Sequence, residues 1–79
     1  MPEQERPLVL QYDTLTGPRL VEIAPVKQMG RVRWHVHAND VRLAVAGSFF
    51  DTRDLAKAGV EAALKKGYGE ALALDWRAA

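Results

Sequence analysis

The sequence predicts an α+β domain in which an antiparallel sheet of four to five strands is packed on one face by a single α-helix, in the order ββββαβ. Alternating apolar and polar residues, the pattern of half-buried strands, fill much of the first half of the chain. The stretch from about residue 53 to 66 instead has the apolar spacing of a helix that faces a core. Short segments with glycine or proline separate these patterns and indicate turns.

The first two strands are predicted over residues 8–13 and 20–24. The even-numbered residues of the first segment are apolar and face the core. Residues 14–18 contain a Gly-Pro breaker, so the two strands are expected to form a hairpin. Pro25 has no amide donor and is therefore expected to end the second strand or to lie at a sheet edge. Residues 28–30 supply the next turn.

The clearest alternation runs over residues 31–37. It directs Val32, Trp34 and Val36 toward the core and every polar residue of the segment toward the other face. This segment is predicted to be the third strand.

A two-residue turn at Asn39-Asp40 would pair each residue of this strand with a residue of the next segment, with paired residue numbers adding to 79. This register gives apolar pairs in the core and polar or small pairs outside. The expected pairs are Trp34 with Val45, Val36 with Leu43, His37 with Arg42, and His35 with Ala44.

A helix is predicted to begin near Arg53, because Asp51 and Thr52 offer oxygens that can cap its first amides. It should continue to about Lys66 and stop at Gly67. The expected inward stripe is Leu55, Ala56, Gly59, Val60, Ala63 and Leu64.

A glycine inside a helix costs about 1 kcal/mol relative to alanine. We therefore interpret Gly59 as clearance for a bulky sheet residue, for which Trp34 is the first candidate. Residues 70–76 alternate again and are predicted to form the last strand, although their alanine and leucine content would also suit a helix.

The composition excludes several classes of protein. A chain of 79 residues builds one core, so residues 8–79 are expected to form one domain behind a flexible segment, residues 1–7. With no cysteine, disulfides, thiolate metal sites and cysteine nucleophiles are excluded, and a cytoplasmic location is expected. No apolar run approaches the roughly 20 residues of a membrane helix. Eleven basic and ten acidic residues give a net charge of +1, so no whole-molecule field attracts nucleic acid.

Candidate catalytic residues are few. His35 and His37 project from one strand face at a spacing that two-histidine metal sites use, but a stable site needs three or four ligands. A solvated polar face is the favoured interpretation. Ser48, the one serine of the chain, precedes the helix as a turn or capping residue would. The residues around it do not resemble a nucleophile elbow. We therefore expect no enzyme activity, no cofactor and no metal.

The most informative feature is a basic surface on the outer side of the sheet. Between residues 19 and 42 there are five basic and two acidic residues. Guanidinium groups above small side chains can bind a phosphate backbone or an acidic protein surface, and an ordinary solvated face is the simplest alternative. The expected partner-binding residues are Arg31, Arg33, His35, His37 and Arg42, which surround Ala44 and Ala46.

Three features occur in order along residues 30–76: Trp34 in a predicted strand, Phe50-Asp51-Thr52 before an alanine-containing helix, and Leu74-Asp75-Trp76 after a glycine. In these features the segment resembles the sheet-plus-helix DNA-binding domains of the plant ethylene-response and integrase arm-binding type. The resemblance implies a sheet packed on one helix and nucleic-acid contacts at Arg31, Arg33 and Arg42. The arginine-rich first strand of those domains has no counterpart here, because residues 19–27 are largely apolar and contain Pro25.

These features together favour a small non-enzymatic binding or regulatory protein that docks on a macromolecular partner through the basic sheet face. A protein partner is favoured, because a net charge of +1 gives weak non-specific affinity for nucleic acid. A phage-type inhibitor such as an anti-CRISPR protein is an example of this size and kind. The alternative is a small DNA- or RNA-binding domain that uses the same strand face. No membrane contact is expected, and monomer and homodimer both remain open.

Overall fold

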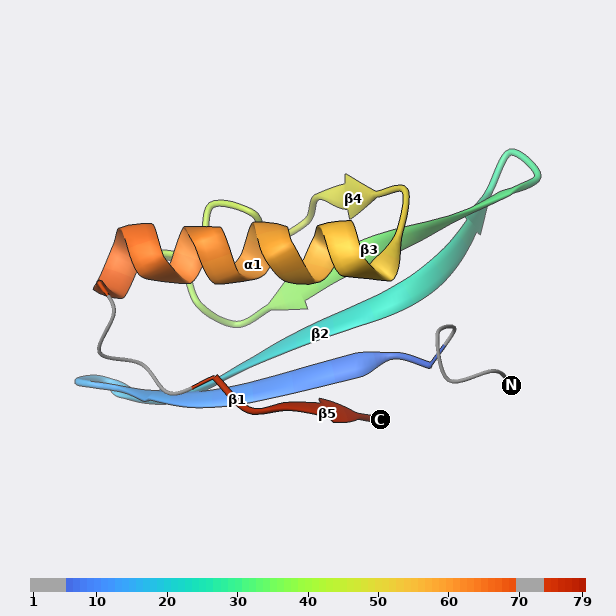
Figure 1. Ribbon diagram of the computed structural model, residues 1–79. Coiled ribbons are helices and arrows are strands. Elements are labelled where there is room, and N and C mark those ends of the chain that lie inside the picture. The colour runs from blue at the N-terminus through green and yellow to red at the C-terminus, as the bar shows by residue number, and fades with distance from the viewer. Residues whose placement is uncertain (1–5, 70–73) are drawn as a thin grey trace.

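The computed structural model describes residues 6–69 and 74–79 and consists of one sheet with one helix on it (Figure 1). All pairings are antiparallel, and the strands lie in the order β4-β3-β2-β1-β5. This confirms the predicted α+β fold with the order ββββαβ. The elements are β1 (Leu8–Thr14), β2 (Gly17–Gln28), β3 (Arg31–Ala38), β4 (Phe49–Phe50), α1 (Arg53–Tyr68) and β5 (Trp76–Ala78).

The core lies between α1 and the inner face of β1, β2 and β3. Helix α1 contributes Ala56, Val60 and Leu64, which repeat every four residues and therefore form one stripe. The strands contribute alternate residues, as the period of two requires. The buried strand and loop side chains are Leu10, Tyr12, Val21, Ile23, Trp34, Val36 and Leu43. Within the described part of the chain, no helix is long and apolar enough to span a membrane.

Strand β2 is longer than expected and continues through Pro25. Its pairing with β1 ends at Ile23, whereas its pairing with β3 continues to Gln28. Pro25 therefore lies where β2 has a neighbour on only one side, and its missing amide costs no bond to β1. Pro25 thus lies in the part of β2 that has one unpaired edge, and it does not end the strand.

The β2–β3 hairpin projects past the N-terminal end of α1 (Figure 1). Its turn residues, Met29 and Gly30, both have positive φ angles, 50° and 78°, as the tight turns of two-residue hairpins require. Because the helix does not reach this end, Val32 is 57% exposed. The prediction that Val32 faces the core is wrong for this reason.

The predicted register between β3 and the following segment is also wrong. Trp34 pairs with Phe50 and His35 with Phe49, so paired residue numbers add to 84 and not to 79. Asn39 and Asp40 are not a hairpin turn, because their side chains bind distant parts of the chain. Asn39 Oδ1 accepts a hydrogen bond from the Leu20 amide (2.9 Å), and Asp40 accepts from two tyrosine hydroxyls.

Residues 39–48 consequently form a loop, and none of the four predicted pairs forms. Leu43 nevertheless enters the core, and Val45 packs against it. The apolar pattern of this segment therefore predicted its burial, although not its secondary structure.

Helix α1 begins as predicted and ends slightly later. Thr52 is the N-cap, and its hydroxyl accepts a hydrogen bond from the Leu55 amide (3.1 Å). The helix passes through Gly67, and the cap is Gly69, whose φ of 77° suits glycine. Leu55, expected in the core, is 54% exposed, because it lies in the first turn beside the core stripe.

Gly59 provides clearance for Phe50 and not for Trp34. A Cβ atom on Gly59 would lie 2.7 Å from Cζ of Phe50 and 2.9 Å from its Cε1. The register explains the difference, because Phe50 takes the position opposite Trp34 and fills the space below the helix.

The chain ends in β5, which pairs with β1. Residues 70–73 of the predicted last strand lie outside the described residues. Residues 74 and 75 are not in a strand, and the strand itself is Trp76–Ala78, so it begins later than predicted. The Trp76 indole donates a hydrogen bond to Glu61 Oε2 of α1 (3.0 Å). Of the segment predicted to be flexible, residues 1–5 also lie outside the described residues, and Pro7 accepts a hydrogen bond from the Ala79 amide (2.9 Å).

Candidate binding surface

Four of the five predicted contact residues lie on the face of the sheet that α1 leaves uncovered (Figure 1). On β3 they alternate with Trp34 and Val36, which are buried under the helix. The odd-numbered residues of β3 must therefore point their side chains to the outer face. These four residues are Arg31, Arg33, His35 and His37.

Neighbouring strands complete this outer face. His37 lies opposite Glu22 of β2, Arg33 opposite Val26, and Arg31 opposite Gln28. Leu20 and Val26, 46% and 37% exposed, add apolar area. The outer face is thus a mixture of aliphatic, basic and polar groups, and it includes the carboxylate of Glu22.

Phe49 belongs to the edge strand β4 and lies on the outer face beside His35 and Arg33. Its ring centroid lies 4.8 Å from that of His35, and the guanidinium carbon of Arg33 lies 5.9 Å from the ring centroid. Arg33 Nε is buried and has no hydrogen-bond partner among the described residues, although Asp51 Oδ1 lies 3.5 Å away. Aromatic and carboxylate contacts therefore hold Arg33 in place and partly neutralise it.

Phe49 is a residue of this face that the sequence patterns above did not predict. The adjacent phenylalanines at 49 and 50 were the available signal, because neighbouring residues of a strand point to opposite faces. With one of them under the helix, the other had to lie outside.

Arg42 does not belong to this surface. It lies in the 39–48 loop, with its guanidinium carbon 5.7 Å from the ring centroid of Tyr68, the last residue of α1. The predicted group of five residues depended on a fourth strand at residues 42–46, which does not exist. Ala44 and Ala46 lie in the same loop and form no floor for the basic groups.

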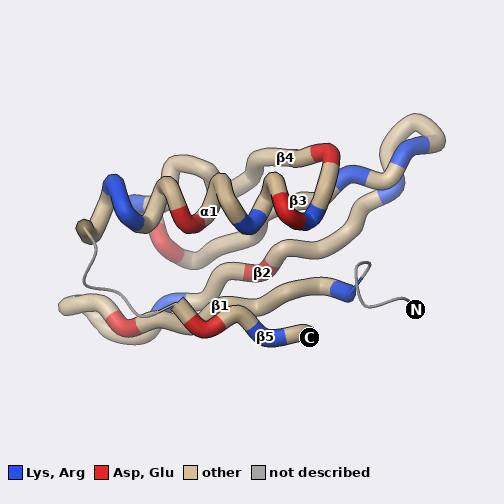
Figure 2. The backbone as a smooth tube through the Cα atoms, viewed as in Figure 1, with Lys and Arg blue, Asp and Glu red and all other residues tan. Residues whose placement is uncertain are grey.

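The cationic part of the surface is the projecting end of the β2–β3 hairpin. We define residues 25–33 as the hairpin arm. It contains Lys27, Arg31 and Arg33 and no carboxylate, and Figure 2 shows only basic colour there. The exposed apolar residues of the arm are Val26, Met29 and Val32.

The histidine pair is not part of a cluster of three or more metal-ligating side chains in the described residues. His35 packs on Phe49, and His37 lies across from Glu22. Among residues 6–69 and 74–79, no three or more His, Asp or Glu side chains are gathered closely enough to hold a metal ion. Ser48 ends the loop, where its carbonyl accepts a hydrogen bond from the Val36 amide (3.0 Å).

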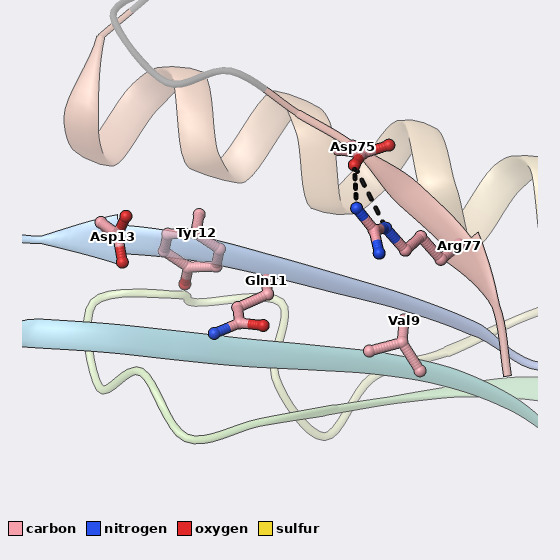
Figure 3. Close-up of a pocket in the computed structure, with 6 residues that line it drawn as sticks. All are labelled: Val9, Gln11, Tyr12, Asp13, Asp75 and Arg77. Atoms are coloured by element: carbon pink, nitrogen blue, oxygen red, sulfur yellow. Dashed lines mark hydrogen bonds and ion pairs between the residues drawn. The ribbon is translucent and has the colours of Figure 1, made fainter.

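A shallow pocket of about 290 Å³ lies beside β1 and β5 (Figure 3). Its one arginine, Arg77, donates from Nε and from a terminal nitrogen to Asp75 Oδ2, at 3.2 and 3.0 Å. The other lining residues are Val9, Gln11, Tyr12 and Asp13. Because this cation is already paired, the pocket has little attraction for an anionic ligand.

A buried carboxylate lies at the opposite end of the molecule from the hairpin arm. Asp40, 5% exposed, accepts hydrogen bonds at Oδ2 from the hydroxyls of Tyr12 and Tyr68, both at 2.6 Å. Its Oδ1 accepts from the Arg42 amide (3.0 Å). This cluster joins β1, the loop and the end of α1.

Burial and hydrogen bonds shift the pKa values of all three groups. Burial alone would raise the pKa of Asp40, but the two tyrosine hydroxyls and the Arg42 amide together hold it below its ordinary value. The pKa of Tyr12 is raised by burial and by its bond to Asp40. The pKa of Tyr68 is raised chiefly by its hydrogen bond to Asp40. Asp40 is therefore ionised and both tyrosines are neutral at pH 7.

Comparisons with protein-family models, with curated proteins and with solved structures found no match to this chain. The resemblance of residues 30–76 to DNA-binding domains stays a prediction.

Proposed function

We propose that this chain is a non-enzymatic binding module that docks on a protein partner through the outer sheet face and the hairpin arm. The observation that carries the proposal is the alternation on β3, which buries Trp34 and Val36 and sends Arg31, Arg33, His35 and His37 together to the uncovered face. Arg42 is not part of the proposed surface.

The residue types of this surface support a protein partner. Protein interfaces are enriched in aromatic residues, methionine and arginine. Here Phe49 packs against Arg33, and Met29 is an exposed residue of the turn between β2 and β3. Exposed valines on both sides of the arm add apolar area that phosphate groups would not use.

The small number of cations on the hairpin arm also favours a protein partner. The arm has three cations, one of which, Arg33, lies 3.5 Å from Asp51. Non-specific affinity for nucleic acid grows with the number of phosphates neutralised, so two or three cations give a weak and salt-sensitive complex. The surface matches better a protein patch with a few carboxylates around an apolar centre.

One form of such a module is a small inhibitor that covers a site on a larger assembly, as phage-encoded inhibitors such as anti-CRISPR proteins do. In that case the partner would be a protein much larger than this chain.

The proposal is tested by co-purification from the source cells with a charge-reversed pair of variants. Arg31→Glu alters the exposed arm, whereas Lys66→Glu makes the same change in net charge in the last turn of α1. We expect Arg31→Glu to lose the partner that the wild type retains, and Lys66→Glu to keep it. Equal retention by both variants would contradict the proposed surface.

A nucleic-acid-binding domain is the second candidate, and the shape of the arm favours it. A two-stranded ribbon fits the major groove, and this one has cations without carboxylates. A gel shift that weakens steeply with salt and is abolished by Arg33→Glu would support this candidate. A complex that survives nuclease treatment would support the protein partner.

A further inference from the structure

A second pocket, of about 340 Å³, lies at the end of the molecule opposite the hairpin arm. The β1–β2 turn, the 39–48 loop and the last residue of α1 form its walls. It shares no residue with the outer face, so it does not depend on the proposed function. Its lining residues are Thr14, Leu15, Thr16, Arg19, Asp40, Val41, Arg42 and Tyr68.

Two guanidinium groups of this pocket are held in position by neutral neighbours. A terminal nitrogen of Arg19 donates to Thr16 Oγ1 (2.7 Å), and Thr16 in turn donates its amide to Thr14 Oγ1 (3.2 Å). Arg42 lies over the ring of Tyr68. In residues 6–69 and 74–79, no carboxylate forms an ion pair with either arginine.

Asp40, the one carboxylate in the pocket wall, already accepts hydrogen bonds at both of its oxygens. Both tyrosine hydroxyls bind its Oδ2, and the Arg42 amide binds its Oδ1. Two positive charges and one buried negative charge leave the pocket with a single positive charge. A singly charged anion is the matching ligand.

The rim of the pocket is partly apolar, which favours a ligand that also has an apolar group. Leu15 and Val41, 108% and 102% exposed, come from two different loops and both line the pocket. A ligand that pairs with the arginines can therefore cover aliphatic side chains at the same time. Arginine forks match the geometry of a carboxylate.

We propose that this pocket binds a carboxylate that is attached to an aliphatic chain, with Arg19 and Arg42 as its partners. Both a free aliphatic acid and an acidic residue between aliphatic residues in a peptide have this chemistry. Carboxylates with no aliphatic group, and doubly charged phosphate, fit the single positive charge and the apolar rim less well.

The test is a titration of the whole chain, followed by the NMR shifts of backbone amides, with hexanoate, hexanol, acetate and inorganic phosphate. We expect hexanoate to move the amides of residues 14–17, 19, 40–42 and 68 at lower concentration than the other three. Arg42→Gln and Arg19→Gln should each weaken hexanoate binding about tenfold or more, since each removes a charge-assisted hydrogen bond.

Arg77→Gln is the matched control, because Arg77 is bonded to Asp75 at the other pocket. It should leave hexanoate binding unchanged. The peptide acetyl-Leu-Asp-Leu-amide, titrated in parallel, identifies the source: tighter binding than hexanoate indicates a protein segment, and weaker binding indicates a free acid. Equal shifts with hexanol, tighter binding of phosphate, or unchanged affinity in Arg42→Gln would overturn the proposal.

Discussion

Asp40 holds three separate parts of the chain together through one carboxylate. Tyr12 comes from β1, Tyr68 from the end of α1, and the Arg42 amide from the loop itself. Hydrogen bonds to a charged acceptor are stronger than neutral ones, and a buried charge without them is costly. The cluster also fixes the start of the 39–48 loop and so prevents the hairpin turn that the sequence suggests.

Asp40→Asn should lower the free energy of unfolding by about 1–3 kcal/mol at pH 7, because the hydroxyls then donate to a neutral acceptor. The folded-state pKa of Asp40 is lowered, so its contribution is present above about pH 4 and is lost as the pH falls through the folded value. Thermal unfolding followed by circular dichroism should therefore show a deficit of several degrees at pH 7 that narrows toward pH 3. A constant deficit at both pH values would contradict the role of the charge.

Both tyrosines of the chain belong to this cluster, which makes their ionisation a direct test. Their folded-state pKa values are raised, so the stabilisation is complete below about pH 10 and is lost as the pH rises further. In an absorbance titration, tyrosinate should appear only above pH 10, and unfolding should accompany it. Asp40→Asn should move the titration to lower pH. A tyrosine that titrates near 10 in the folded wild type would refute the cluster.

Contact between α1 and β4 depends on the absence of a side chain at Gly59. The Phe50 ring occupies the place where a Cβ atom would lie, at 2.7 Å from Cζ. The other glycine inside the helix, Gly67, has ordinary space, with the Arg42 carbonyl oxygen 4.0 Å from its added Cβ. One helix thus contains both a required and a replaceable glycine.

Gly59→Ala should destabilise the fold by about 1 kcal/mol, because overpacking of about 1–3 kcal/mol exceeds the gain of about 1 kcal/mol in helix propensity. Gly67→Ala should instead stabilise by up to about 1 kcal/mol. Urea unfolding of both variants measures this difference. In a Phe50→Leu background the cost of Gly59→Ala should shrink, and an unchanged cost would exclude Phe50 as the obstacle.

Most of the elements could be predicted from the sequence, because each depends on a local pattern. The alternation around Trp34 and the cap at Thr52 need only a few neighbouring residues. The register between β3 and β4 could not, since it depends on Asp40 meeting tyrosines 28 residues away on either side. Arg42 was misplaced for the same reason, whereas Phe49 had a local signal in the two adjacent phenylalanines.

The molecule as a whole is elongated, with extents of 40 × 21 × 18 Å. The length comes from β2, whose 12 residues run from the β1–β2 turn to the hairpin arm. The pocket lined by Arg19 and Arg42 lies at the end with the β1–β2 turn. The helix covers one face from the end with the β1–β2 turn to beyond the middle, leaving the opposite face and the arm uncovered (Figure 1). Two different surfaces are therefore available at the two ends.

The proposal that the outer sheet face binds a partner is tested most directly by photo-crosslinking from a label on a single introduced cysteine. This is possible because the chain contains no cysteine of its own. His37→Cys places the label on the outer face, and Ala62→Cys places it on the exposed side of α1. In extracts of the source cells, we predict one specific product from residue 37, sensitive to protease, competed by unlabelled wild type and not by Arg31→Glu. Equal products from residue 62, or competition by Arg31→Glu as strong as by the wild type, would contradict the proposed surface.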